Sequence, residues 1–140
     1  MQFMVIRKAD AETEAGVQPS AKLIDDMTSY NERLVRSGKM KAGAGLQPSS
    51  RGARVSFRKG KPSVVDGPFA EAKELIAGYS IIEAASLQEV IDLVKDWPPE
   101  DGHGNVEVEI RPLFTAADLG FDEEQKARYA RMEQEQAQQQ

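Results

Sequence analysis

The sequence contains no cysteine, so disulfides and thiolate metal sites are both excluded. This absence fits a reducing compartment. The N-terminal run from Met1 to Ile6 meets Arg7 too early to form the apolar segment of a secretory signal. No apolar stretch approaches the length of a membrane span, so we predict no membrane partner. Together these absences predict a cytoplasmic protein.

Several ligand-binding signals are also missing. The 23 acidic residues outnumber the 18 basic ones and give a net charge of −5, which argues against a general nucleic-acid binder. Gly43-Ala44-Gly45 is too short for a dinucleotide fingerprint, and no glycine-rich phosphate loop is present. No group of His, Asp and Glu has metal-ligand spacing. We therefore predict no metal, no cofactor and no nucleic-acid partner.

Segments with the apolar spacing of helices alternate along the chain with segments that have the apolar spacing of strands. A helix is predicted from the N-cap Ser20 to Gly38, and a second one opens with a capping box at Ser86 and Glu89. Residues 9–18 are predicted to be loop. Strands are predicted at residues 2–8, 40–46, 53–58, 63–65, 78–83 and 106–111. Setting the middle hairpin (53–65) aside, this order predicts an α+β, ferredoxin-like β-α-β-β-α-β sandwich with helices on one face of an antiparallel sheet.

The chain is long enough for one domain. We place that domain at residues 1–115 and a polar, helix-prone tail at residues 116–140. The tail has few apolar residues to bury, so its end is predicted to be disordered.

The run from Asp66 to Glu74 carries the main candidate site. Asp66 lies at the end of a short predicted strand. Its carboxylate would act as a general base in a cleft, or it would accept hydrogen bonds from backbone N–H groups and fix the turn. Glu71, Lys73 and Glu74 would bind a polar ligand at a helix start, with Lys73 holding an anion, or would be solvated first-turn residues.

Three further side chains are candidates. Lys8 ends the first strand, and Arg111 alternates with Glu107 and Glu109 on a charged strand face; both would supply secondary charge to the cleft. His103, the single histidine, lies between two glycines in a loop. A lone loop histidine is a poor metal site, and only a tertiary approach to Asp66 or Glu109 would favour a catalytic role.

The run Asp66-Gly67-Pro68-Phe69 with Glu71 and Lys73-Glu74 resembles the signature of the YCII-related, or DGPF-domain, family of small bacterial proteins. Gly45-Leu46-Gln47-Pro48 and Val108-Glu109-Ile110-Arg111-Pro112 match in the same order, and the similarity covers roughly Met1 to Leu113. The resemblance implies a ferredoxin-like domain that pairs sheet against sheet into a dimeric α/β barrel. Asp66 matches the motif. The histidine–aspartate pair suspected in some members does not transfer, because the early part of this chain has no histidine.

Two functions remain open. In the first, a homodimer binds a small polar or anionic metabolite near Asp66 and Lys73 and performs acid-base chemistry on it. In the second, the protein is a non-catalytic binding or regulatory module, which the resemblance links to sigma-factor regulation, with the tail from Asp122 as a docking segment. Whether the protein is an enzyme stays open. The dimer would bury the second sheet face, with contributions from Val5, Val55, Phe57, Ile81 and Val108.

Overall fold

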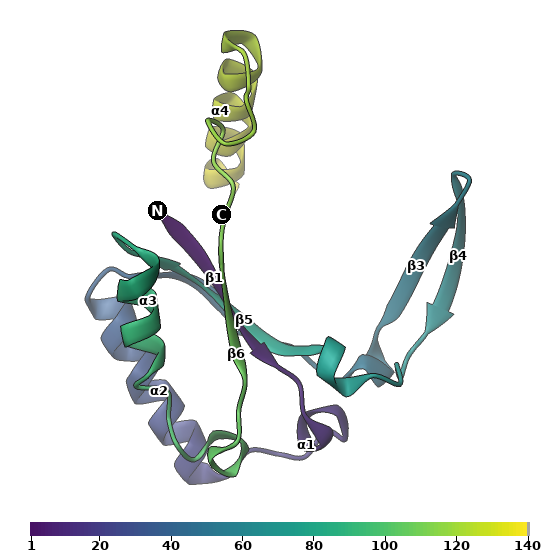
Figure 1. Ribbon diagram of the computed structural model, residues 1–140, viewed down its shortest axis with the longest axis vertical. Coiled ribbons are helices and arrows are strands. Elements are labelled where there is room, and N and C mark those ends of the chain that lie inside the picture. The colour runs from purple at the N-terminus through teal and green to yellow at the C-terminus, as the bar shows by residue number, and fades with distance from the viewer. Residues whose placement is uncertain (140) are drawn as a thin grey trace.

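The computed structural model describes residues 1–139 and contains a four-stranded sheet, a separate hairpin and four α-helices (Figure 1). The sheet order is β2 (Met40–Gly45), β5 (Ile76–Glu83), β1 (Gln2–Lys8), β6 (Val108–Pro112). The hairpin pairs β3 (Ala53–Arg58) with β4 (Lys61–Asp66). The helices are α1 (Ala11–Glu14), α2 (Ala21–Arg36), α3 (Leu87–Val94) and α4 (Glu123–Gln138), and single 3-10 turns cover Ser49–Arg51, Ala72–Glu74 and Asp101–Gly104.

Every pair of neighbouring strands in the main sheet is antiparallel. The connection from β1 through α2 to β2 leaves room for β5 between these two strands, and the connection from β5 through α3 to β6 does the same around β1. This arrangement confirms the predicted mixed α+β class with antiparallel sheets and is consistent with a ferredoxin-like fold.

Both long helices of the domain start at the predicted caps. The Ser20 hydroxyl accepts a hydrogen bond from the Leu23 backbone N–H at 3.1 Å, and the Ser86 hydroxyl accepts one from Glu89 N–H at 3.2 Å. Each serine satisfies a donor that the first helical turn leaves unpaired. The Glu89 carboxylate, however, accepts from Ala85 N–H, one residue before the cap.

The prediction of loop throughout residues 9–18 is wrong in one part, because α1 occupies Ala11–Glu14. Asp10 caps it: its carboxylate accepts from Thr13 N–H, and the Thr13 hydroxyl accepts from Asp10 N–H, both at 2.8 Å. This reciprocal pair is a capping box with threonine in place of the usual glutamate.

The core lies between the sheet and helices α2 and α3. Phe3 and Val5 on β1 and Ile82 on β5 are buried there against Tyr30 and Leu34 of α2 and Val90 of α3. Val5 and Val108 were predicted to help cover the second sheet face, and this is wrong for both. Alternation places them with Phe3 on the helix-covered face, where Val108 packs against the core.

The opposite sheet face, called the open face here, has no helix over it within residues 1–139. By register it carries Met4 opposite Ile81 and Ile6 opposite Tyr79, all half-buried. The hairpin projects on this side, away from α2 and α3, and α4 extends beyond the end of β6 (Figure 1). The predicted disorder at the end of the tail stays a prediction, although α4 is helical to Gln138; residue 140 lies outside the described residues. No helix within residues 1–139 has the length and hydropathy needed to cross a membrane.

The core predicts a clear contrast between two valines in helices. Val90→Ala should lower the free energy of unfolding by about 2 kcal/mol, since it removes two methyl groups from a side chain that is 0% exposed. Val35→Ala, at a position 57% exposed on α2, is the matched control and should change it by less than about 0.5 kcal/mol. Urea unfolding monitored by circular dichroism measures both, and equal losses would contradict this assignment of the core.

Candidate functional site

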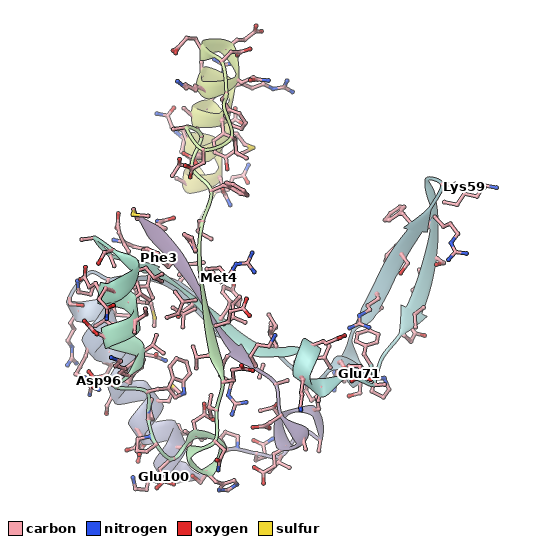
Figure 2. The ribbon with its side chains drawn as sticks, viewed as in Figure 1. Phe3, Met4, Lys59, Glu71, Asp96 and Glu100 are labelled. Carbon is pink, nitrogen blue, oxygen red and sulfur yellow. The ribbon has the colours of Figure 1, made fainter. Side chains whose placement is uncertain are left out.

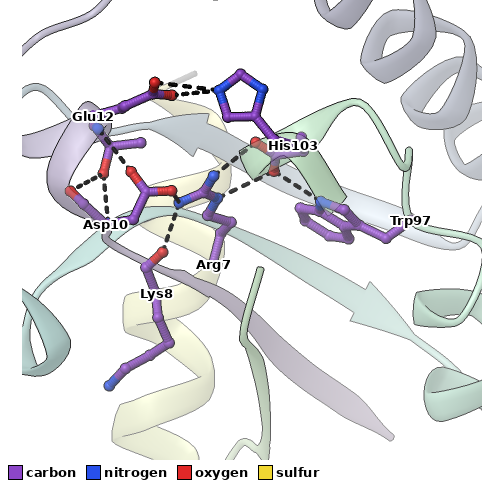
Figure 3. Close-up of polar contacts among 8 residues, drawn as sticks. Arg7, Lys8, Asp10, Glu12, Trp97 and His103 are labelled. Atoms are coloured by element: carbon purple, nitrogen blue, oxygen red, sulfur yellow. Dashed lines mark hydrogen bonds and ion pairs between the residues drawn. The ribbon is translucent and has the colours of Figure 1, made fainter. Parts of the chain in front are cut away.

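A buried arginine organises one end of the domain. Arg7, on β1, is 7% exposed and Asp101 is 8% exposed. The guanidinium makes a two-pronged contact with this carboxylate, from Nη2 to Oδ1 at 2.7 Å and from Nε to Oδ2 at 3.1 Å (Figure 3). Nη1 donates to Asp10 Oδ2 at 3.1 Å and to the Lys8 carbonyl at 2.9 Å. Arg7 thus ties the end of β1 to the loop after α3 and to the start of α1.

The indole of Trp97 completes the cluster. Its Nε1–H donates to Asp101 Oδ2 at 2.9 Å, so this carboxylate accepts bonds from two different side chains. The Trp97 ring also packs against the Tyr30 ring, with centroids 5.6 Å apart and planes tilted by 56°. Aromatic packing and the hydrogen bond therefore fix the indole from both ends.

The paired charges shift each other's ionisation. Burial acts to raise the pKa of Asp101, but hydrogen bonds from Arg7 and Trp97 and the charge of Arg7 overcome it and hold the pKa below its usual value. The pKa of Asp10 is lowered in the same way: burial opposes the shift, and Thr13 N–H and Arg7 outweigh it. Burial acts to lower the pKa of Arg7, and the two aspartates raise it instead. All three groups are therefore charged at neutral pH.

His103 lies beside this cluster in a left-handed stretch of backbone. Gly102, His103 and Gly104 have φ of 57°, 56° and 84°. Residues other than glycine rarely adopt such values unless the surrounding structure stabilises them. A Cβ at residue 102 would lie only 2.7 Å from Val106 Cγ2, so both this contact and the positive φ favour glycine there. His103 Nε2 lies 3.0 Å from Glu12 Oε2 (Figure 3). The imidazole thus contacts a carboxylate of α1, and the two side chains are 78% and 55% exposed.

A cavity of about 930 Å³ opens between α2, the sheet and the loop that contains His103. Its apolar wall includes side chains from α2 and the sheet, and the Arg7 cluster with Glu12 and His103 forms its polar end. Burial, followed by the charge of Asp96, raises the pKa of the Tyr30 phenol to about 12, so Tyr30 stays a neutral donor to the Leu93 carbonyl at 2.9 Å. The apolar wall includes Val5, Leu23, Met27, Tyr30, Leu34, Met40 and Trp97.

Among the sequence-predicted candidates, only His103 lines this cavity. The hydrogen-bond partner of its imidazole within residues 1–139 is Glu12, rather than Asp66 or Glu109. Lys8 and Arg111 lie on the open face by strand alternation. Asp66 ends β4 at the base of the hairpin, and Glu71, Lys73 and Glu74 lie in or beside the turn at Ala72–Glu74 (Figure 2).

The turn after Asp66 holds the hairpin to the domain. A Cβ at Gly67 would lie 1.7 Å from the Ser49 carbonyl oxygen, so only glycine fits there. Phe69 N–H donates to the Ser49 hydroxyl at 3.0 Å, and the Arg54 guanidinium lies 3.9 Å from the centre of the Phe69 ring. The chain brings Lys8 near the turn at residues 72–74, because Ala9 N–H donates to Leu75 O at 2.9 Å. The catalytic and turn-fixing roles of Asp66 both stay predictions.

Sequence reasoning missed Asp10, Glu12 and Asp101. One signal for the cluster was present, since Arg7 falls on the inward face of β1 in register with Phe3 and Val5, and a buried charge needs a partner. The identity of that partner, 94 residues away, had no local signal. Within residues 1–139, no three histidine, aspartate or glutamate side chains are grouped so as to hold a metal ion.

An antiparallel α+β domain with a cavity beneath its helices is the class that this geometry defines. The sequence pattern of the YCII-related domain matches residues 1–113. "Uncharacterized protein R00369" of Rhizobium meliloti (strain 1021) is 34% identical over 95 residues, which cover 66% of this chain and 73% of that protein. The chain belongs to the YCII-related family.

A solved structure resembles the chain more loosely. It is the 5-chloro-2-hydroxyhydroquinone dehydrochlorinase of Burkholderia phenoliruptrix AC1100 in complex with 2,5-dihydroxybenzoquinone. The TM-score is 0.42 at 20% sequence identity, and the match covers 84% of this chain and 99% of that one.

The buried pair predicts a pH-dependent loss of stability. Asp101→Asn should lower the free energy of unfolding at pH 7 by about 3 kcal/mol, because it removes the main counter-charge of a buried arginine. Glu32→Gln, which breaks an ion pair with Arg36 whose side chains are 51% and 76% exposed, is the control and should cost less than about 1 kcal/mol.

The pH dependence has a definite sign. The folded pKa of Asp101 is depressed, so its stabilisation is present above the unfolded pKa and is lost as the pH falls through the folded pKa. The gap between the wild type and Asp101→Asn should therefore narrow below about pH 4. Urea titrations at a series of pH values measure this gap, and a gap that widens on acidification would contradict the paired carboxylate.

Proposed function

We propose that this YCII-related protein binds a small, neutral, largely apolar molecule in the cavity beneath α2, and that His103 and Glu12 move a proton to or from it. One observation carries the proposal: an imidazole is held 3.0 Å from a carboxylate, in left-handed backbone, at the polar end of a cavity of about 930 Å³. Backbone strain of this kind and convergent polar groups concentrate at functional sites.

The lining decides the kind of ligand. Its apolar wall suits a hydrocarbon or aromatic body, with the Tyr30–Trp97 pair as the aromatic part of that wall. At the polar end, the carboxylates of Asp10, Glu12, Glu100 and Asp101 outnumber Arg7 and His103. An anion would be repelled there, particularly since the charge of Arg7 is already compensated by two aspartates.

A hydroxyl group fits the polar end better than a carboxylate, because Glu12 and an unprotonated imidazole nitrogen both accept hydrogen bonds. For this cavity we therefore propose a neutral ligand with a hydroxyl donor. The anion site predicted at Asp66 and Lys73 is a separate hypothesis, at the base of the hairpin.

The proton chemistry follows from the imidazole–carboxylate pair. When His103 Nε2–H donates to Glu12, the ring carries its lone pair on Nδ1. A ligand hydroxyl that gives its proton to Nδ1 becomes an oxyanion and leaves an imidazolium, which the Glu12 carboxylate stabilises. The reverse transfer returns the proton. The forward and reverse transfers together are general acid-base catalysis.

The single tryptophan of the chain provides the test, because Trp97 lies in the cavity wall. Phenol and catechol should change Trp97 fluorescence and raise the thermal midpoint, by several degrees at about a hundred times the dissociation constant, whereas benzoate should do neither. Glu12→Gln and His103→Gln should weaken phenol binding about tenfold, the loss of one hydrogen bond to a charged or basic partner. Glu32→Gln is the matched control for charge removal.

Two outcomes would decide against this site. Binding that prefers benzoate and disappears in Asp66→Asn would favour the site predicted at the hairpin base. No response to any of the three probes would contradict the proposal and favour the second predicted function, an interaction module that uses the tail from Asp122.

We also infer that two chains associate through their open faces, which gives the dimeric α/β barrel implied by the family. Met4, Ile6, Tyr79 and Ile81 form the apolar centre of a sheet face without a helix over it in residues 1–139, and a sheet with one apolar face needs a second layer. Sedimentation equilibrium at micromolar concentration should give twice the chain mass of 15.4 kDa. A mass of one chain would contradict the dimer.

A further inference from the structure

Within residues 1–139, the hairpin formed by β3 and β4, called the arm here, pairs with no other strand. All of its strand residues are exposed, and its tip at Lys59 projects far from the sheet (Figure 2). A two-stranded ribbon is marginally stable by itself in water. The contacts at its base, including Arg54 over the Phe69 ring, anchor one end only.

The two faces of the arm differ in chemistry. Register places Val55 opposite Val64 and Phe57 opposite Pro62 on one face, which is an apolar strip. Phe57 is 70% exposed and Val64 is 66% exposed. The other face carries Arg54 opposite Val65 and Arg58 opposite Lys61. Exposed apolar residues that gather on one side of a projecting element mark an interaction surface.

The charge of the arm indicates what it meets. Residues 53–66 contain four basic side chains and one acidic side chain, a net charge of +3, in a chain of net charge −5, so the remaining residues carry −8. The rest of a second copy is therefore electrostatically complementary to the arm. Nucleic acid would meet the same basic side chains, but the acidic body would oppose its approach.

We propose that the arm clasps a second copy of this chain, with the strip Val55–Phe57–Pro62–Val64 packed against the partner's open face beside the contact between the two sheets. The arm and the open face lie on the same side of the sheet (Figure 1), and both present apolar side chains, which are exposed on the arm and half-buried on the open face. A twofold axis lets each arm cover the other chain. This proposal rests on the inferred dimer and adds the element that holds it together.

Two neighbouring valines of β4 give a matched test. Val64→Asp places a charge in the apolar strip. Val65→Asp makes the same change of residue, and so the same change in strand propensity, on the opposite face of the same strand. Sedimentation velocity should show the dimer dissociation constant raised about 100-fold by Val64→Asp, since burying an unpaired carboxylate is costly. Val65→Asp should stay within about threefold of the wild type. Both positions are exposed in the single chain, so both variants should keep its circular dichroism spectrum.

A second measurement locates the contact without relying on dissociation. Benzoylphenylalanine at position 57, in place of Phe57, should form on irradiation a product of twice the chain mass. Mass spectrometry should find the cross-link on partner peptides from β1 or β5. Cross-links within one chain, or to the partner's α2 or α4, would overturn the proposal.

The remaining outcomes separate the hypotheses. A dimeric wild type with equal dissociation constants for the two variants would overturn the arm and leave the dimer standing, whereas a monomeric wild type would overturn both. Binding of a labelled 20-base-pair duplex at low salt that is lost in Arg58→Gln/Lys61→Gln, with an unchanged dimer, would overturn the arm and favour nucleic acid. Trp97 fluorescence reports ligand binding independently of all these results.

Discussion

The ion pair of Arg7 with Asp101 is the constraint on which the rest of the structure depends. A guanidinium on the inward side of a central strand costs several kcal/mol unless its donors are paired. Asp101 must therefore contact β1 although it lies 94 residues further along the chain, and Asp10 must stay at the N-terminus of α1. These two demands fix the loop after α3 and the start of α1 against one end of the sheet, where the cavity has its polar end.

The position of His103 is a consequence of that pair. The residue after Asp101, Gly102, has left-handed backbone, and a Cβ there would collide with Val106. The left-handed backbone of Gly102 continues into His103 and presents the imidazole to Glu12 on α1. Arg7 also anchors α1 through Asp10. The positions of His103 and Glu12 therefore both depend on Arg7.

Local sequence signals predict the helices and strands well and the candidate site poorly. The reason is the sequence separation between the residues that determine each. The caps at Ser20 and Ser86, the strands and the α+β class follow from residues a few positions apart. Arg7 shows its inward direction through alternation with Phe3 and Val5, yet no local rule connects it to Asp101. Asp66 belongs to a distinctive motif, and the structure shows one physical reason for it: Gly67 lies against the Ser49 carbonyl, and Phe69 N–H donates to the Ser49 hydroxyl.

The sheet separates two surfaces with different chemistry, and strand alternation sets which residue serves which. On β1, Val5 and Arg7 face the cavity, while Met4 and Ile6 face the opposite side, where the arm projects. A ribbon such as the arm gains little from its own two strands, so its amphipathic pattern makes sense only in contact with another surface. The cavity, in contrast, is complete within one chain. The proposed ligand binding therefore needs only the helix-covered side, and the proposed association needs only the other side. A substitution confined to one side should leave the other intact, except in β1 and β5, whose backbones carry both.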